Sequence, residues 1–209
     1  MDFVPASEHR ALADTARAYL ARRFPAERVG ELADSAAGWD PDSWTEIVKL
    51  GWLDPAVGAV GQAVLAEATG YALYPGPWWS TVGLAGGVLT GTAPATLAWA
   101  EDGVSTLDEA ARAAGCRFDG TLSGEKTAVP DAALCDTVVV VAREAGGIGL
   151  YAAELAAAEV SSLSTVDSSR RLARVRFDRV PARRIVAPGE AGAVLAAVRH
   201  RSLALLAAE

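Results

Sequence analysis

The residues from Phe118 to Arg143 read FDGTLSGEKTAVPDAALCDTVVVVAR, and this stretch decides the fold. Its Asp119-Gly120 dipeptide tolerates the positive φ angle of a tight hairpin, so we expect a short strand on each side of it. The run from Thr137 to Ala142 contains four consecutive valines, which is typical of a strand buried on both faces. The stretch therefore predicts a hairpin, then an alanine- and proline-rich corner, and then a core strand.

Further short apolar segments lie around this stretch, and turn residues separate them at intervals of roughly eight to twelve residues. A series of short, regularly spaced strands indicates a β-barrel or a β-sandwich. We therefore expect one antiparallel domain. The predicted strands are residues 97–100, 115–118, 122–126, 137–142, 148–153, 160–164 and 173–177.

The segments before and after the strands have helical patterns. Ser7 is placed to cap a first helix, and Asp40-Pro41 is placed to begin a later one, because it supplies a capping carboxylate and a proline in the first turn. Gly51 is expected to end that later helix. The remaining predicted helices are residues 58–73, 78–90 and 190–208.

These patterns together predict an α+β fold with three parts. An all-helical N-terminal domain is expected at residues 1–94, and an antiparallel β-barrel or sandwich domain at residues 95–188. Residues 189–209 are expected to begin a C-terminal helical bundle. A helix at this position leaves an apolar face that needs cover, so we expect an oligomer or further sequence.

The chain has 209 residues and a formal net charge of −7, which makes nucleic acid a poor partner because phosphate neutralisation needs clustered lysine and arginine. Seven arginines do crowd residues 170–184. We interpret them as a solvated strand face that pairs with the surplus carboxylates. Contact with an anionic ligand or with a neighbouring subunit is the alternative interpretation.

No charge occurs between Glu67 and Glu101, a gap long enough to span a bilayer. Prolines and glycines interrupt the gap, so we interpret it as a buried helix with a flanking loop and expect no membrane partner. The N-terminus has no basic and apolar leader. Cys116 and Cys135 lie far apart with no second pair, so we expect two free thiols in a cytoplasmic protein.

The order of these motifs resembles the acyl-CoA dehydrogenase family over essentially the whole chain. In the family's middle β-domain, a Gly-x-Lys-x-aromatic-Ile-Thr-Asn-Ala pattern precedes an Ala-Asp pair and a valine strand, and Gly124-Glu125-Lys126 begins the matching segment here. Residues 44–53, 73–77 and 165–172 also match. The resemblance implies FAD as cofactor and α,β-desaturation of an acyl-CoA thioester, with the flavin accepting the hydride. Residues 189–209 match only the first helix of the family's C-terminal four-helix bundle.

The first of the family's two flavin-facing strands usually reads Leu-Thr-Glu-Pro-Gly-x-Gly-Ser-Asp. The best match here runs from Trp99 to Ser105, and the family's threonine is replaced by Ala100. The resemblance therefore implies Trp99, Ala100 and Ser105 as flavin contacts. Backbone N–H groups of Trp99 or Ala100 can serve there without a hydroxyl, because strand-edge amides do not depend on the side chain.

The second flavin-facing strand usually supplies an aromatic ring that stacks on the flavin and a threonine close to flavin N5. At those positions this chain has Ala128 and Pro130, and proline removes both a side-chain hydroxyl and a backbone donor. The implied flavin contacts on this strand are Thr127, Ala128, Val129 and Pro130. In a register shifted by one or two residues, Thr127 supplies the hydroxyl.

The catalytic base is a glutamate of the C-terminal bundle in most of the family. In a minority it lies early in the helix after the β-domain, just before an arginine, and His200 occupies that position in Arg199-His200-Arg201. Histidine can act as a base near neutral pH, so His200 is the one catalytic candidate. No carboxylate lies near it in sequence to orient its ring, and a surface or interface role is the alternative.

Three hypotheses follow from these residues. The first is an FAD-dependent acyl-CoA dehydrogenase chain, with FAD and acyl-CoA bound between this chain and a helical bundle. The second is a catalytically silent subunit of a homo- or hetero-oligomer, whose acyl-CoA dehydrogenase-like partner shares or holds the FAD. The third is an assembly module that uses Trp78-Trp79 as an exposed surface for a partner. The alternative for these two residues is that both rings are buried in the core.

Overall fold

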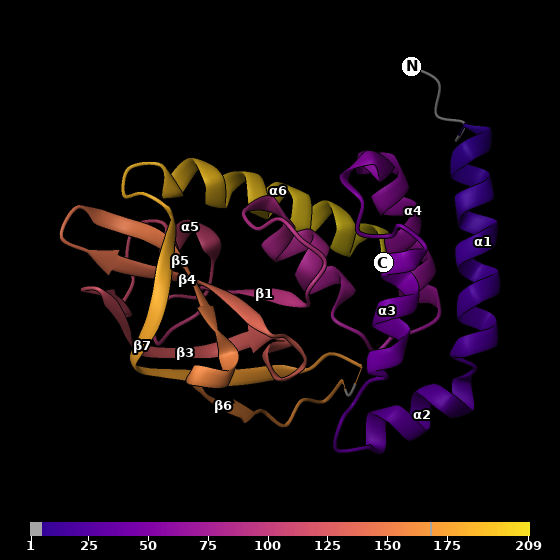
Figure 1. The fold of residues 1–209 in the computed structure, drawn as a ribbon, viewed down its shortest axis with the longest axis horizontal. Coiled ribbons are helices and arrows are strands. Elements are labelled where there is room, and N and C mark those ends of the chain that lie inside the picture. Colours follow the sequence, from indigo (N-terminus) through magenta and orange to yellow (C-terminus); the bar gives the residue numbers. More distant parts are fainter. Residues whose placement is uncertain (1–5, 168) are drawn as a thin grey trace. The chain divides into compact units, whose positions relative to one another are not determined.

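A computed structural model describes residues 6–167 and 169–209, and Ser168 of the 165–172 motif lies outside the described residues. The chain divides into two compact units (Figure 1). The helical unit comprises the residues up to Gly76 together with Leu203–Glu209, and the β unit comprises Pro77–Ser202. The predicted α+β class is confirmed. The domain boundaries predicted after residues 94 and 188 stay predictions.

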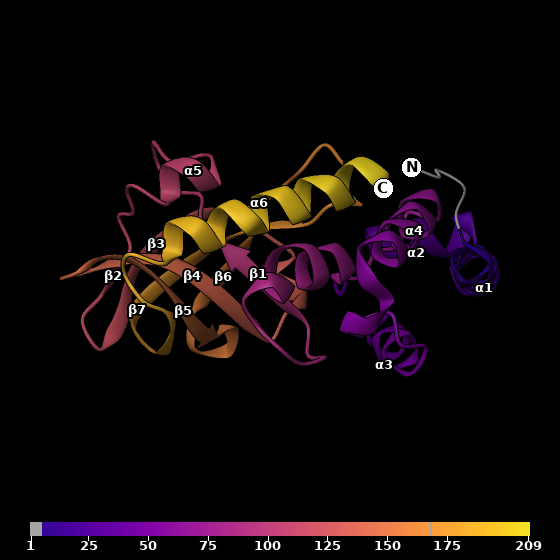
Figure 2. The same cartoon turned by 90° about the horizontal axis from the view of Figure 1, so that it is seen from above.

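In the helical unit, α1 and α4 lie side by side in both views (Figures 1 and 2). Both predicted boundaries of the helix at Pro41–Lys49 are confirmed. At its start the Asp40 carboxylate accepts a hydrogen bond of 3.1 Å from the Asp42 N–H, and after its end Gly51 has a φ of 77°. Ser7 lies inside α1, whose N-cap is Ala6. The helices are α1 (Ser7–Arg23), α2 (Ala26–Asp34), α3 (Pro41–Lys49), the short η1 (Pro55–Val57) and α4 (Gly58–Tyr71).

A polar network joins α1 to α3 inside the helical unit. The Tyr19 hydroxyl donates to a Glu46 carboxylate oxygen at 2.7 Å. The Arg23 guanidinium lies 2.8 Å from an Asp40 carboxylate oxygen and 3.4 Å from Glu46. Tyr19 also packs edge-on against Trp52, with 5.5 Å between the ring centroids. The network thus gives partners to charged groups beside the helical core.

In the β unit, seven strands form one sheet in the order β1-β4-β2-β3-β7-β5, and β6 pairs with β7 outside this path. Because β4 also pairs with β5, the path from β4 through β2, β3, β7 and β5 closes into a barrel. Strand β4 pairs in parallel with β1 and β2, and the other pairs are antiparallel. The strands are β1 (Ala95–Ala98), β2 (Arg117–Phe118), β3 (Thr121–Pro130), β4 (Thr137–Glu144), β5 (Gly147–Glu154), β6 (Glu159–Ser162) and β7 (Leu172–Val186).

The predicted hairpin joins β2 to β3. Gly120 has a φ of 102°, and Phe118 pairs with Leu122 across the turn. Strand β3 continues beyond the predicted segment to Pro130, with irregular pairing to β7 between Leu122 and Gly124 and between Lys126 and Val129. Such irregularities bend a strand, so β3 runs into the alanine- and proline-rich corner and ends there at Pro130, before η4.

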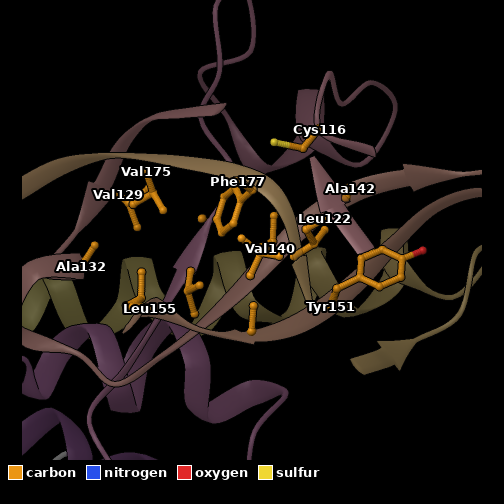
Figure 3. Packing of buried hydrophobic residues seen from close by; sticks show 14 of the residues in the cluster. Cys116, Leu122, Val129, Ala132, Val140, Ala142, Tyr151, Leu155, Val175 and Phe177 are labelled. Carbon is orange, nitrogen blue, oxygen red and sulfur yellow. The ribbon is translucent and has the colours of Figure 1, made fainter. Parts of the chain in front are cut away.

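The valine run of β4 is buried on both faces, as predicted. Val138 and Val140 pack inside the barrel, in the cluster of apolar side chains that Figure 3 shows. Val139 and Val141 pack in a second cluster with residues of α6 (Ala191–Ala208), such as Leu195. Up to Ser202, α6 extends along the outside of the barrel (Figures 1 and 2). The continuous apolar sequence of β4 is therefore explained by helix cover on one side and the barrel interior on the other.

The helix predicted at residues 78–90 is shorter and irregular. A π-helical turn, η2 (Ser80–Leu84), is followed by a 3₁₀ turn, η3 (Ala85–Gly87). Glycines at this point lower helix propensity, which accounts for the early end. Trp78 is buried. This ring is therefore part of the core and not of an exposed tryptophan pair. The remaining short helices are α5 (Leu107–Ala110), η4 (Ala132–Leu134) and η5 (Leu155–Ala157).

Candidate functional site

The two predicted flavin-facing strands meet at one corner of the β unit. The Thr127 N–H donates to the Ala100 carbonyl at 2.9 Å, just beyond the end of β1. Further along, the Thr96 hydroxyl donates to the Pro130 carbonyl at 2.7 Å. The structure therefore brings the end of β1 beside the second half of β3. We call residues 99–101 and 126–131 the β1–β3 corner.

The predicted contacts on the first strand are already bonded within the chain. The Trp99 indole N–H donates to the Ser105 carbonyl at 3.0 Å, and the Ser105 N–H donates to the Glu109 carboxylate at 2.9 Å. That carboxylate completes a capping box with Thr106 at the start of α5. The Ser105 hydroxyl is exposed. The Trp99 indole N–H and the Ser105 backbone groups are thus used in hydrogen bonds within this segment.

The predicted contacts on the second strand differ in availability. Val129 is fully buried in the barrel core, while Thr127, Ala128 and Pro130 are half-buried. Ala128 and Pro130 have no side-chain polar atom, and proline has no N–H. The Thr127 hydroxyl thus remains as the side-chain donor that this strand can offer. The assignment of these residues as flavin contacts stays a prediction.

A buried ion pair lies behind the corner. The Lys126 ammonium is 2.5 Å from Glu101 Oε1, and it also donates to the Trp99 carbonyl at 3.3 Å. The Lys126 side chain is 0% exposed and the Glu101 side chain is 8% exposed. The Glu101 carboxylate also accepts the Cys116 N–H at 3.0 Å and the Gly115 N–H. Both charges are therefore compensated in an environment with almost no water.

The pKa values at the corner follow from these contacts. Burial acts to raise the pKa of Glu101, but the hydrogen bond and the positive charge of Lys126, together with the two backbone N–H groups, lower it overall. Burial raises the pKa of the neighbouring Cys116 thiol to about 12, so this thiol is protonated and unreactive at neutral pH.

A second buried carboxylate at the corner went unnoticed in the sequence. Asp131 follows Pro130 with a φ of 51°, in the left-handed region, and its carboxylate accepts a hydrogen bond from the buried Ser80 hydroxyl of η2. Nearby, the Arg170 guanidinium stacks over the Trp79 ring at 5.4 Å from its centroid. Asp131 and Ser80 are 51 positions apart in sequence, so no local spacing could have revealed this contact.

His200 lies on an exposed face of α6. Its Nε2 is 3.3 Å from a guanidinium nitrogen of Arg199, and Arg199 also forms an ion pair of 2.5 Å with Asp108. The structure gives His200 no orienting carboxylate among the described residues, and its role as a base stays a prediction.

The arginine-rich strand is β7 and the loop before it. Arg174 lies 3.3 Å from Glu125, and Arg184 lies 3.4 Å from Glu144. Arg176 pairs in register with Glu159 on one side and with Glu125 on the other. These neighbours support the interpretation of a solvated, charge-paired face.

Residues 6–167 and 169–209 offer little for other kinds of site. No group of three or more histidine, cysteine, aspartate or glutamate side chains in that range could hold a metal ion. By length and composition alone, α6 is apolar enough to cross a membrane, but core helices of water-soluble proteins pass the same test. A cleft of about 700 Å³ in the β unit is lined mainly by small residues such as Ala95 and Ala152, and none of its lining residues belongs to the β1–β3 corner.

No protein-family model matches the chain, and no curated protein matches it in sequence. Solved structures do match. The Tcur3481-Tcur3483 steroid ACAD superimposes with a TM-score of 0.77 at 25% identity, over 96% of this chain and 62% of that chain. The ChsE4-ChsE5 complex from Mycobacterium tuberculosis gives 0.79 at 17% identity, over 98% and 64%. An acyl-CoA dehydrogenase complexed with FAD, from Bacillus anthracis, gives 0.77 at 16% identity, over 98% and 41%.

The chain thus has the fold of acyl-CoA dehydrogenases, and the resemblance predicted from the sequence is confirmed. It spans less than two thirds of the length of the first two structures named above. The likeness covers nearly all of this chain, so both the helical unit and the β unit have counterparts in those enzymes.

The fold implies a flavin, and the donors of the β1–β3 corner can be compared with what the ring needs. A bound isoalloxazine is held by hydrogen bonds to its ring atoms and by stacking. Positions 100, 128 and 130 offer two methyl groups and a pyrrolidine ring, and the Trp99 indole N–H is bonded to Ser105. The side-chain donors left are the Thr127 and Ser105 hydroxyls, and the backbone N–H groups of Trp99 and Ala100 add hydrogen bonds but no aromatic ring at position 128 to stack on the flavin. The residues present therefore do not fit a flavin held by this chain alone.

Proposed function

We propose that this chain is a subunit of an acyl-CoA dehydrogenase assembly. In this assembly, a partner chain of the same fold makes most of the contacts to the bound FAD. The reaction of the assembly would be α,β-desaturation of an acyl-CoA thioester, with FAD as the hydride acceptor. In this role the chain supplies a helical unit and a barrel wall, and its partner supplies the ring contacts and the base. Both FAD and acyl-CoA then bind to the assembly.

One observation carries this proposal. The β1–β3 corner keeps the backbone arrangement of the fold, with Thr127 bonded to Ala100, but the Thr127 hydroxyl is the one side-chain donor that Thr127–Pro130 offer. In the family pattern, positions 100 and 130 supply hydroxyls and position 128 supplies an aromatic ring that stacks on the flavin, and this chain has alanine, proline and alanine there. Two similar structures, Tcur3481-Tcur3483 and the ChsE4-ChsE5 complex, are named as pairs of chains, which is consistent with a paired assembly.

A second candidate function is a flavoenzyme that works without another kind of chain. The half-buried Thr127 favours it, because its hydroxyl is the donor that a shifted register would bring to the flavin. This candidate predicts that the isolated chain is yellow when purified. It also predicts that Thr127→Ala abolishes the colour and the activity together.

The two candidates separate in a co-expression experiment. The complete protein is produced alone, and also together with a flavin-bearing chain of the acyl-CoA dehydrogenase fold from the same organism. Native mass spectrometry then measures the subunits and bound FAD, and an electron-acceptor assay measures desaturation of a panel of acyl-CoA thioesters. The proposal expects a mixed oligomer that contains FAD and is active. An active, flavin-loaded homo-oligomer of this chain would refute it and support the second candidate.

A further inference from the structure

Lys126 stands out because the sequence has only two lysines. Lys49 is exposed on α3, whereas Lys126 is completely enclosed beside the β1–β3 corner. The chain otherwise uses arginine for positive charge, and it places its second lysine where a compact ammonium has to fit between a carboxylate and a carbonyl. The position therefore needs a small, buried point charge.

The Glu101 carboxylate links Lys126 to several other segments of the chain. It accepts hydrogen bonds from the Cys116 and Gly115 N–H groups, which lead into β2, while Lys126 belongs to β3. The Glu101 backbone closes a tight turn with Val104 through two hydrogen bonds of 2.9 and 3.0 Å. One ion pair thus ties the end of β1, the following turn, the start of β2 and the middle of β3.

Two glycines leave room for this junction. A Cβ atom at Gly115 would lie 2.7 Å from Glu101 Oε2, and a Cβ atom at Gly124 would lie 2.7 Å from Cys116 Sγ. Gly124 also has a φ of 134°, which disfavours any residue with a side chain. The close packing around the pair is thus built into the sequence at four positions.

Stability alone does not account for a buried ion pair. The cost of removing two charges from water offsets most of their attraction, and apolar residues of similar size often stabilise a protein equally well. What an ion pair adds is direction, because the carboxylate and the ammonium fix the geometry of each hydrogen bond. Here the fixed geometry belongs to the corner at which Thr127 bonds to Ala100.

We propose that Glu101 and Lys126 are positioning residues, which hold the β1–β3 corner in the shape that the flavin-bearing partner docks against. This inference rests on the proposed function, because it takes the partner as given. It goes further by locating the docking geometry in two side chains that touch neither partner nor cofactor. The half-buried residues Thr127, Ala128 and Pro130 form the contact surface that the pair supports.

The test uses the double variant Glu101→Leu/Lys126→Met, which removes both charges and leaves no unpaired one, with Lys49→Met as the matched control. Thermal unfolding, amide hydrogen exchange and FAD content of the co-expressed complex are measured for each. We expect the double variant to stay folded. Its Gly115 and Cys116 amides should exchange about tenfold faster, because each has lost its acceptor. FAD content should fall at least about fivefold, a loss of roughly 1 kcal/mol of docking energy.

The outcomes separate the positioning role from a purely structural one. Undiminished FAD content in the double variant would overturn the proposal whatever its melting temperature, because the pair would then be dispensable for docking. If the wild-type chain captures no flavin-bearing partner, the proposed function fails. In that case the docking role fails with it, whereas a wild-type complex that carries FAD and a double variant that retains the same FAD would refute the docking role alone.

Discussion

Replacing Lys126 with methionine is the most revealing single change. It removes the ammonium but leaves the Glu101 carboxylate, of which 8% is exposed, bound only by the Gly115 and Cys116 N–H groups. Removing one partner of a buried ion pair typically costs about 3–5 kcal/mol. We expect the lower end of that range, ~3 kcal/mol, because the two N–H groups still stabilise the anion.

The assay is thermal unfolding followed by circular dichroism, with Lys49→Met as the control. In a chain of this size, 1 kcal/mol shifts the melting temperature by about 2–4 °C, so Lys126→Met should lower it by roughly 6–12 °C. The exposed Lys49 carries no comparable contact, and its variant should stay within about 2 °C of wild type.

The pH dependence of the two proteins should differ in sign. In wild type the pKa of Glu101 is lowered by Lys126 and two N–H groups, against the opposing effect of burial. Its contribution to stability is therefore present above the ordinary glutamate pKa and is lost as pH falls through the lowered value. In Lys126→Met burial dominates and raises the pKa, so protonation relieves the variant and the gap to wild type narrows between about pH 7 and pH 4.5. A loss equal to that of Lys49→Met, or a gap independent of pH, would refute the reasoning.

Three further predictions test other parts of the structure. Gly124→Ala should destabilise the protein by ~2–4 kcal/mol, because position 124 has a left-handed φ and the added Cβ atom would overlap Cys116. Gly30 lies in open space on α2, so Gly30→Ala should stabilise the protein by ~0.5–1 kcal/mol. Equal effects of the two variants in denaturant titrations would contradict this. Tyr19→Phe should lower the free energy of unfolding by ~1 kcal/mol at pH 7, with the exposed Tyr71→Phe as control. Burial and then Glu46 raise the Tyr19 pKa, so the wild type loses stability as pH rises above about 10, and the variant should lose less. Identical alkaline unfolding curves for wild type and variant would argue against this. His200→Ala should change the turnover of the assembled complex by less than about twofold, and a loss of more than about tenfold would restore His200 as the base.

The parts of the fold that the sequence predicted are those with a local physical cause. Asp119-Gly120 specified a hairpin because glycine reaches a positive φ, and Asp40-Pro41 specified a helix start because the carboxylate caps an N–H. The valine run of β4 specified a strand buried on both faces because no polar side chain interrupts it. In each case the deciding residues are neighbours in the sequence.

The parts that the sequence did not predict depend on distant residues. The parallel pairing of β1 with β4 leaves no mark in the alternation of either strand. In the π-helical turn η2, Ser80 and Thr81 donate hydrogen bonds to Asp131 and Ala95, which are distant in the sequence. Lys126 lies in a quoted motif, but its burial against Glu101 spans 25 positions. The capping box at Thr106 and Glu109 was the one overlooked local signal, and it would have predicted α5.

The central claim is that this chain has the acyl-CoA dehydrogenase fold without a flavin site that works alone. The most direct measurement is an FAD titration of the complete, isolated protein, followed by the visible absorption of bound flavin after gel filtration. We expect a colourless protein with no retained FAD, and retention of FAD only when the flavin-bearing chain is present. Stoichiometric FAD on the isolated chain would show that its own residues suffice to hold the flavin.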